Sequence, residues 1–236
     1  MKTVYVYVQD TLADWEAGYA VAELHSGRFF RPTAEPLTVK TCALARETVR
    51  TMGGFRIWPD LTVDEICLSE AALLILPGSD TWLTLQHEMI LEKAADFLAA
   101  GIPVAAICAA TVALGRAGLL NRRRHTSNDL EFLRTICGDS YAGMKLYEQQ
   151  PAVIDGDLIT AAGTAPLEFA RHIFERLDVF SPATLAAWYG LHKEKQPMYY
   201  DQLMASLAKR EKEGGGVDYR LRGKLNSRAN WSAALL

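Results

Sequence analysis

The chain has 236 residues, 50% of them hydrophobic, with a formal net charge of −3 and a pI of about 6.0. This length is more than one average domain and less than two, which favours one large α/β domain followed by a tail. The near-neutral charge excludes a general basic surface for nucleic acid, and no apolar run is long enough to span a membrane, so we expect a small-molecule substrate as the partner.

The N-terminal part of the chain predicts short strands and one helix. Val and Tyr alternate over residues 4–8, which is typical of a strand buried in a parallel sheet. Residues 13–24 predict a helix with Glu16 in its first turn, where an acidic residue ordinarily remains solvated and interacts favourably with the helix dipole. Further strands are predicted at residues 37–42 and 48–51.

A continuous apolar run at residues 71–76 predicts another buried strand, which ends at a Pro-Gly turn. Backbone N–H groups in such a loop lie at the carboxyl end of the strand, where ligand sites form in α/β folds. Gly78 and Ser79 are therefore candidate donors to an oxyanion. A long amphipathic helix is predicted to follow at residues 82–100.

The apolar run around Cys108 changes from strand to helix at that residue. The residues before it predict a buried strand, and Ala109 begins a segment of good helix formers. Because the turn between them must be tight, we expect a nucleophile elbow, in which the sulfur faces free N–H groups such as that of Ala109. Those groups favour a thiolate, although a cysteine at the end of a core strand is also common as a packing residue.

His125 follows three arginines in a loop, and loops often carry functional side chains. The arginine cluster itself is typical of a solvated surface. The next helix is predicted at residues 130–137, with Ser127 or Asn128 as its N-cap.

The rest of the chain predicts a hairpin, a helix and a C-terminal extension. An Asp-Gly pair between apolar runs predicts the hairpin over residues 152–160, and Pro166 is typical of a first helical turn. The composition then becomes more polar and helical, and a run of glycines precedes a segment typical of a flexible tail. We therefore divide the chain into a main domain at 1–180, a helical extension at 181–213 and a tail at 214–236.

The four cysteines lie far apart, with no C-x-x-C pattern and no histidine cluster beside them. This spacing indicates neither a zinc site nor a redox pair, so we expect no metal and no cofactor. Unpaired cysteines are typical of a reducing compartment, and we expect a cytoplasmic protein. The cysteines are Cys42, Cys67, Cys108 and Cys137.

Five motifs stand out along the chain, namely Asp14-Trp15-Glu16, Leu76-Pro77-Gly78, Ala106-Ile107-Cys108-Ala109, His125-Thr126-Ser127-Asn128 and the stretch from Asp155-Gly156 to Phe169. In this order and spacing they resemble those of the ThiJ/PfpI superfamily, which shares the class I glutamine amidotransferase-like fold. The resemblance covers about residues 2–177. It implies a flavodoxin-like three-layer α/β sandwich with a mostly parallel sheet, a reactive Cys108 at the elbow, Glu16 beside it and frequent homodimerisation. It also implies a loop histidine near the cysteine, which His125 matches.

Elementary chemistry constrains the implied pair of Cys108 and Glu16. An ionised carboxylate against the sulfur would raise the thiol pKa, so Glu16 must be protonated and donate a hydrogen bond to a thiolate. The thiolate would then attack an electrophilic carbonyl while the backbone donors named above bind the oxyanion. Glu16 or His125 would move the protons.

Two departures from the resemblance narrow the expected activity. A PfpI-type protease has a histidine immediately after the nucleophile, where this chain has Ala109. A glutamine amidotransferase has a C-terminal His-x-Glu, where this chain has Gly-Thr-Ala-Pro at residues 163–166. We therefore expect a metal-independent, cysteine-dependent hydrolase or lyase that acts on small carbonyl or amide compounds, as glyoxalases, deglycases and amidases do.

Two other functions remain open from the sequence. Oxidation of Cys108 to a sulfinic acid would make the protein a redox sensor in a stress response. Alternatively, the C-terminal helices would cover the pocket or a partner in a non-catalytic interaction module. The aromatic residues concerned are Trp188, Tyr189, Tyr199 and Tyr200.

Overall fold

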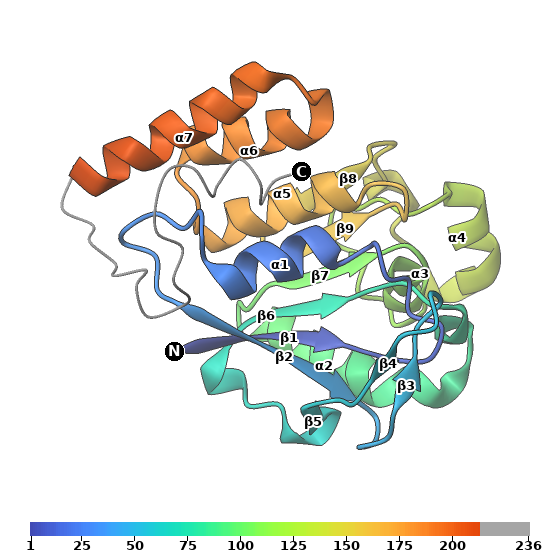
Figure 1. Ribbon diagram of the computed structural model, residues 1–236. Helices are drawn as coiled ribbons and strands as arrows, with labels where there is room; N and C mark the ends of the chain where they lie inside the picture. The colour runs from blue at the N-terminus through green and yellow to red at the C-terminus, as the bar shows by residue number, and fades with distance from the viewer. Residues whose placement is uncertain (213–236) are drawn as a thin grey trace.

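A seven-stranded sheet with the order β5-β2-β1-β6-β7-β9-β8 forms the middle layer of the protein in a computed structural model that describes residues 1–212 (Figure 1). Its strands are parallel except β8, which pairs antiparallel with β9. The strands are β1 (Lys2–Tyr7), β2 (Leu37–Ala43), β5 (Leu61–Thr62), β6 (Ala71–Leu76), β7 (Val104–Ile107), β8 (Ala152–Asp155) and β9 (Leu158–Ala161). A separate antiparallel pair joins β3 (Val49–Arg50) and β4 (Arg56–Ile57).

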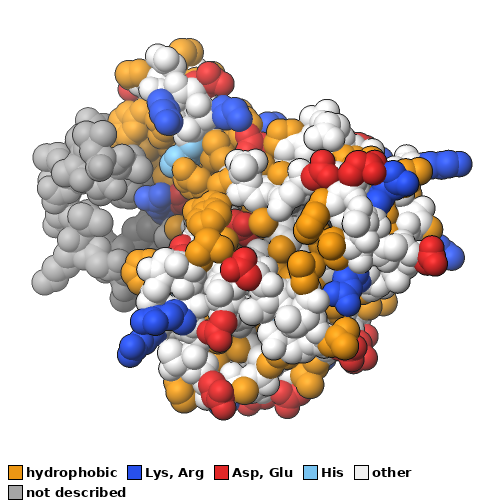
Figure 2. Space-filling view, turned by 90° about the vertical axis from the view of Figure 1, so that its right-hand side faces the viewer, with side chains coloured by type: hydrophobic (Ala, Val, Ile, Leu, Met, Phe, Trp, Pro, Cys, Tyr) orange, Lys and Arg blue, Asp and Glu red, His pale blue; other side chains and the backbone are white. Residues whose placement is uncertain are grey.

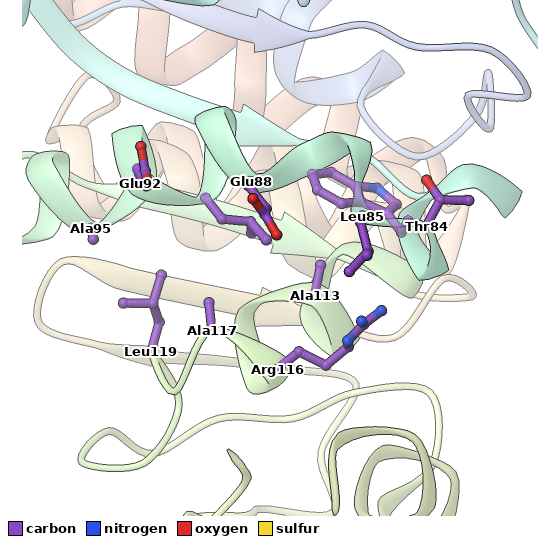
Figure 3. Close-up of a pocket in the computed structure, with 11 residues that line it drawn as sticks. Thr84, Leu85, Glu88, Glu92, Ala95, Ala113, Arg116, Ala117 and Leu119 are labelled. Atoms are coloured by element: carbon purple, nitrogen blue, oxygen red, sulfur yellow. The ribbon is translucent and has the colours of Figure 1, made fainter.

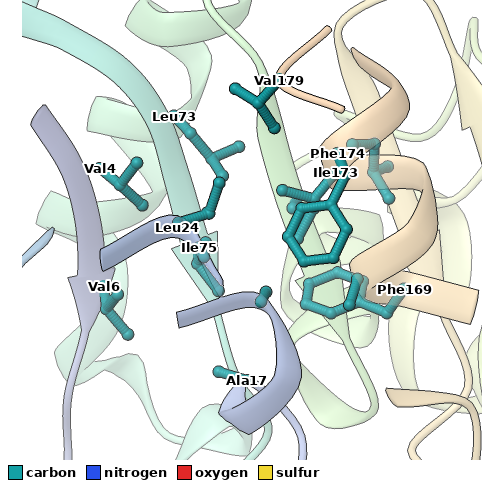
Figure 4. Packing of buried hydrophobic residues seen from close by; sticks show 14 of the residues in the cluster. Val4, Val6, Ala17, Leu24, Leu73, Ile75, Phe169, Ile173, Phe174 and Val179 are labelled. Atoms are coloured by element: carbon teal, nitrogen blue, oxygen red, sulfur yellow. The ribbon is translucent and has the colours of Figure 1, made fainter. Parts of the chain in front are cut away.

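Helices cover both faces of the sheet, as expected where strands carry apolar residues on both sides. On one face lie α1 (Gly18–Ser26) and α5 (Pro166–Leu177), whose apolar side chains pack on those of β1, β6 and β7 (Figure 4). On the other face lie α2 (Glu88–Ala99) and α3 (Ala109–Arg116), with α4 (Leu130–Cys137) packed against α3. This arrangement confirms the predicted flavodoxin-like α/β sandwich.

The predicted helical extension is present as α6 (Pro182–Glu194) and α7 (Pro197–Lys212), which lie outside α1 and α5 (Figure 1). Trp188 of α6 is fully buried, and its indole N–H donates to Glu23 of α1 at 3.2 Å. Arg28 donates two hydrogen bonds to the same carboxylate, so this buried charge is paired. The extension therefore shares a hydrophobic cluster with α1 and α5, while the predicted tail at 214–236 lies outside the described residues.

Two predicted helices begin later than their sequence patterns indicate. The first begins at Gly18, because Ala13 donates its N–H to Gly78 O at 2.9 Å and Asp14 accepts the Gly53 N–H at 2.6 Å. These tertiary contacts keep the preceding residues in a turn, so Glu16 lies in the loop before α1.

The helix predicted at residues 82–100 begins as α2 at Glu88, after two short 3-10 turns. The Trp82 indole donates to Pro77 O at 2.7 Å, and this contact holds the first of those turns against the loop after β6. None of the helices within residues 1–212 combines the length and the apolar character needed to cross a membrane.

Candidate active site

Cys108 lies between Ile107 at the end of β7 and Ala109 at the start of α3. Its φ of 61° and ψ of −130° are rare for a residue with a side chain and match the predicted nucleophile elbow. Its N–H donates to Ala161 O at 2.9 Å, and the Thr111 hydroxyl donates to its carbonyl at 2.6 Å. These bonds hold a half-buried sulfur at the edge where the parallel strands end, and Figure 2 shows the molecule from that side.

Glu16 reaches the same point from the loop between β1 and α1. Its side chain is buried, with the residue only 1% exposed, and Oε2 accepts the Gly78 N–H at 2.6 Å. Its other oxygen, Oε1, is buried without a hydrogen-bond partner and lies close to the Cys108 sulfur. The structure thus brings the two predicted residues, Cys108 and Glu16, together.

Two glycines make this close approach possible. A Cβ added to Gly78 would lie 2.8 Å from both the Cys108 Cβ and Glu16 Oε2. A Cβ added to Gly163, in the loop after β9, would lie 2.8 Å from the Cys108 sulfur and 3.1 Å from Glu16 Oε1. Any side chain at either position would therefore displace the pair, which places the sulfur and Oε1 side by side beneath the Gly163 backbone.

Asn128 completes the surroundings of the sulfur, a role that the sequence analysis missed. Its Nδ2 donates to the Cys108 sulfur at 3.2 Å, and its Oδ1 accepts the Gly163 N–H at 2.8 Å. The exposed indole of Trp15 donates to the Gly163 carbonyl at 3.1 Å, so both sides of this glycine are held. The cap of α4 is Asp129, whose Oδ1 accepts the Phe132 N–H at 2.7 Å, and Asn128 is therefore free for the site.

The structure does not bring His125 to this group. His125 is fully buried, its Nδ1 lies 2.7 Å from Arg123 O, and its Nε2 lies 2.6 Å from the Tyr141 hydroxyl. Because a carbonyl only accepts, Nδ1 carries the proton and Nε2 accepts from Tyr141. Burial lowers the pKa of His125, so the ring is a neutral packing residue that joins two loops.

Comparisons with known proteins agree with this fold. A profile of the DJ-1/PfpI family matches residues 2–176. This chain belongs to the DJ-1/PfpI family. It is 47% identical to a Bacillus subtilis protein named uncharacterized protease YoaZ over 87% of this chain and 98% of that protein.

Solved structures of the DJ-1/PfpI family superpose on this fold. A ThiJ/PfpI family protein from Bacillus anthracis is 48% identical, with a TM-score of 0.83 over 87% of this chain and 98% of that one. A DJ-1 superfamily protein from Agrobacterium tumefaciens is 29% identical, with a TM-score of 0.70 over 82% and 100%. The DJ-1/PfpI match contains Glu16, Cys108, Asn128 and Gly163, and α6 and α7 follow it.

Burial dominates the electrostatics of this DJ-1/PfpI site. It raises the pKa of Glu16 to about 7, against the lowering effects of the Gly78 N–H and of Cys108. Burial also raises the pKa of the Cys108 thiol, which Asn128 and the Ala109 N–H lower and an ionised Glu16 raises further. The direction for the thiol is thus opposite to the low value that the elbow alone predicts, because the sulfur is half-buried beside an acid.

The effect of Glu16 on the thiol changes sign with its protonation state. An ionised Glu16 repels a thiolate, whereas a protonated Glu16 donates to it. Two N–H groups, from Asn128 and Ala109, face the sulfur, while the buried carboxyl group has the Gly78 N–H alone among its backbone partners. Taken singly, the pKa of about 7 for Glu16 and the raised pKa of the thiol would ionise Glu16 first. Because more donors surround the larger, more exposed sulfur, we propose that the coupled pair instead carries its single negative charge there and keeps its remaining proton on Glu16.

The predicted backbone donors are placed differently from one another. The Ala109 N–H, at the start of α3, lowers the pKa of the Cys108 thiol. The Gly78 N–H already donates its hydrogen bond to Glu16 Oε2. The Ser79 hydroxyl is buried and pairs with Thr81 Oγ1 at 2.9 Å.

A cavity of about 370 Å³ lies apart from this site, between α2 and α3 (Figure 3). It contains neither Cys108 nor Glu16 in its walls. Within residues 1–212, no group of three or more His, Cys, Asp or Glu side chains is arranged to hold a metal ion. The lining residues include Leu85, Glu88, Glu92, Ala113, Arg116 and Leu119.

Proposed function

We propose that this protein is a cysteine-dependent enzyme that acts on small carbonyl compounds, with α-oxoaldehydes as the favoured class and small amides as the second. The observation that carries the proposal is the pairing of an elbow cysteine with a buried carboxyl group whose pKa is raised to about 7. A carboxyl group with a pKa near neutral pH both donates and accepts protons efficiently, as general acid and base catalysis requires.

The proposed reaction begins with the Cys108 thiolate. Its electron pair forms a C–S bond to the aldehyde carbon, and the carbonyl oxygen takes the proton of Glu16. The Glu16 carboxylate then removes the proton on that carbon and returns it to the neighbouring carbon, while the proton of the new hydroxyl group passes to the oxygen on that neighbouring carbon, which gives a 2-hydroxy thioester. Water cleaves the thioester, releases a 2-hydroxy acid and restores the cysteine, so the net change is the addition of one water without an external oxidant.

The chain offers less support for peptide hydrolysis, although the relative YoaZ carries the word protease in its name. The residue after the nucleophile is Ala109, and no histidine in the described part of the chain hydrogen-bonds to Cys108 or Glu16. The predicted histidine, His125, is neutral and occupied by other partners. A single carboxyl group is sufficient for the proton transfers of the small-carbonyl reaction.

The test measures turnover of methylglyoxal and of a panel of small amides by the wild type and by Cys108→Ser. We expect Cys108→Ser to lose at least two orders of magnitude in kcat/KM, because a serine hydroxyl stays protonated where the thiol ionises. Cys67→Ser is the matched control, since Cys67 is exposed and lies before the start of β6, whereas Gly78 of the site follows the end of that strand. Turnover that survives in Cys108→Ser would refute the proposal.

A redox sensor is the second candidate, because Cys108 combines a half-exposed sulfur with a buried acid beside it. Hydrogen peroxide would oxidise the thiolate to a sulfenate with release of water, and a second peroxide would give a sulfinate that accepts a hydrogen bond from Glu16. Mass spectrometry after mild peroxide treatment tests this function. Addition of two oxygen atoms at Cys108 ahead of the exposed Cys67 supports it, and prior oxidation of Cys67 counts against it.

A further inference from the structure

We propose that Asn128 is a third catalytic residue, which donates a hydrogen bond to the nucleophilic sulfur and is held in that orientation by the Gly163 backbone. This inference rests on the proposed function of Cys108. It assigns to a neutral amide the place beside the nucleophile where catalytic cysteines elsewhere commonly have a histidine.

The orientation of the Asn128 amide follows from the chemistry of its two contacts. The Gly163 N–H is a donor and lies 2.8 Å from Oδ1, so Oδ1 must be the accepting atom. The opposite end of the amide, Nδ2, then points a donor at the Cys108 sulfur at 3.2 Å. A reversed amide would place two donors against each other at Gly163 and two acceptors against each other at the sulfur.

A donor in this position stabilises the thiolate more than the thiol. A thiol is a weak acceptor, whereas a thiolate carries a full charge, and hydrogen bonds to charged groups are about twice as strong as neutral ones. The contact with Asn128 lowers the pKa of the Cys108 thiol and so opposes the effect of burial. Asn128 therefore increases the fraction of nucleophile that is ionised at neutral pH.

Gly163 is required for this arrangement in two ways. Its N–H fixes the amide, and its missing side chain leaves space for the sulfur, since a Cβ would approach the sulfur to 2.8 Å. Its carbonyl is held by the Trp15 indole, so the residue that orients Asn128 is itself restrained on its other side. Asn128 is exposed, and an exposed amide with both ends engaged is unlike an ordinary surface asparagine.

The experiment compares Asn128→Ala and Asn128→Asp in a Cys67→Ser background, which removes the other exposed thiol. The rate of alkylation by iodoacetamide is measured from pH 5 to 10, and the modified residue is identified by mass spectrometry. Asp has the shape of Asn and can still accept the Gly163 N–H, but it presents a carboxylate oxygen to the sulfur. Thermal unfolding of each variant reports any loss of structure.

We expect Asn128→Ala to raise the thiol pKa by about 1–2 units, because it removes one hydrogen bond to a charged atom. Alkylation at pH 7 then slows by about tenfold for each unit. Asn128→Asp should raise the thiol pKa further, since it adds a like charge. An unchanged thiol pKa in Asn128→Ala would overturn the inference. A shifted thiol pKa in Asn128→Asp would not rescue it, because the added charge alone raises that pKa.

The outcome is independent of the substrate question. Alkylation reports the sulfur directly, so a protein that fails to turn over methylglyoxal or amides can still show the predicted shifts. Conversely, turnover that persists in Cys108→Ser would end the proposed function while leaving the hydrogen bond from Asn128 to be measured in the same assay.

Discussion

The assignment of the negative charge to sulfur and the proton to Glu16 can be tested with two substitutions of Glu16. Gln keeps an acceptor for the Gly78 N–H at 2.6 Å, and this contact directs its amide N–H toward the Cys108 sulfur. Leu removes the acid and the donor together. Both variants are made in a Cys67→Ser background, because Cys67 is exposed and its contacts with Ser69 lower its pKa.

The two possible charge states predict opposite shifts. If Glu16 is the neutral donor, Leu removes a hydrogen bond to a charged group worth about 1.5–3 kcal/mol, and the thiol pKa rises by about 1–2 units. Gln supplies a neutral donor in the same place, and its thiol pKa stays within about one unit of the wild type. If Glu16 instead carries the charge, both variants remove a like charge and the thiol pKa falls by about 1–3 units.

The assay is the pH dependence of Cys108 alkylation by iodoacetamide, followed by mass spectrometry. Burial raises the pKa of Cys42, and that of Cys137 to about 11, so neither competes at neutral pH. A fall of the thiol pKa in both Glu16 variants would refute the assignment and would make Glu16 the resident anion and the thiol its proton donor.

Four further predictions concern stability and packing. Burial holds the pKa of Glu16 at about 7 against 4.5 unfolded, so its protonated form favours folding and stability falls as pH rises between these values, by about 3 kcal/mol in total. Urea titration at pH 5 and 8 should show this slope in the wild type and lose most of it in Glu16→Gln. Cys108→Gly should be about 1 kcal/mol more stable than Cys108→Ala in the same titration, because glycine relieves a φ of 61°; equal stabilities would argue against strain. His125→Ala should lower the free energy of unfolding by about 2–4 kcal/mol through a cavity and unpaired groups, without moving the thiol pKa; a shifted thiol pKa would restore a catalytic role. Gly163→Ala should abolish rapid thiol alkylation, whereas Gly18→Ala, with open space around its Cβ, should leave it unchanged; equal rates in the two variants would contradict the steric reasoning.

Sequence patterns predicted the sheet and the elbow because these features are local. Continuous apolar runs identify strands buried on both faces, and the change of period at Cys108 identifies the turn between β7 and α3. Helix starts were predicted less well, since the turn before α1 is held by contacts with Gly53 and Gly78, far along the chain. Propensity alone carries no record of such contacts.

The sequence predicted His125 beside Cys108, but the structure has Asn128 there, and local sequence patterns could not have distinguished the two. Histidine is the usual proton carrier, which made His125 the natural candidate in its loop. His125 and Asn128 lie three residues apart in one loop. Which of them points into the core and which toward the sulfur depends on the pairing of His125 with Tyr147 and of Asn128 with Gly163. One local signal existed, since Asn128 and Asp129 both suit an N-cap and α4 needs only one.

The site shows how a sheet edge can set the charge of a cysteine through backbone groups. The Gly78 N–H orients the carboxyl group of Glu16, and the Gly163 N–H orients the amide of Asn128. Both glycines follow strands that flank β7, β6 on one side and β9 on the other, so parallel order alone brings their loops to Cys108. Because the Gly163 N–H occupies the accepting end of the Asn128 amide, the donating end faces the sulfur, and a protonated Glu16 held by the Gly78 N–H would donate there as well. The order of three neighbouring strands therefore decides which side chains reach the nucleophile, as much as the identity of those side chains does.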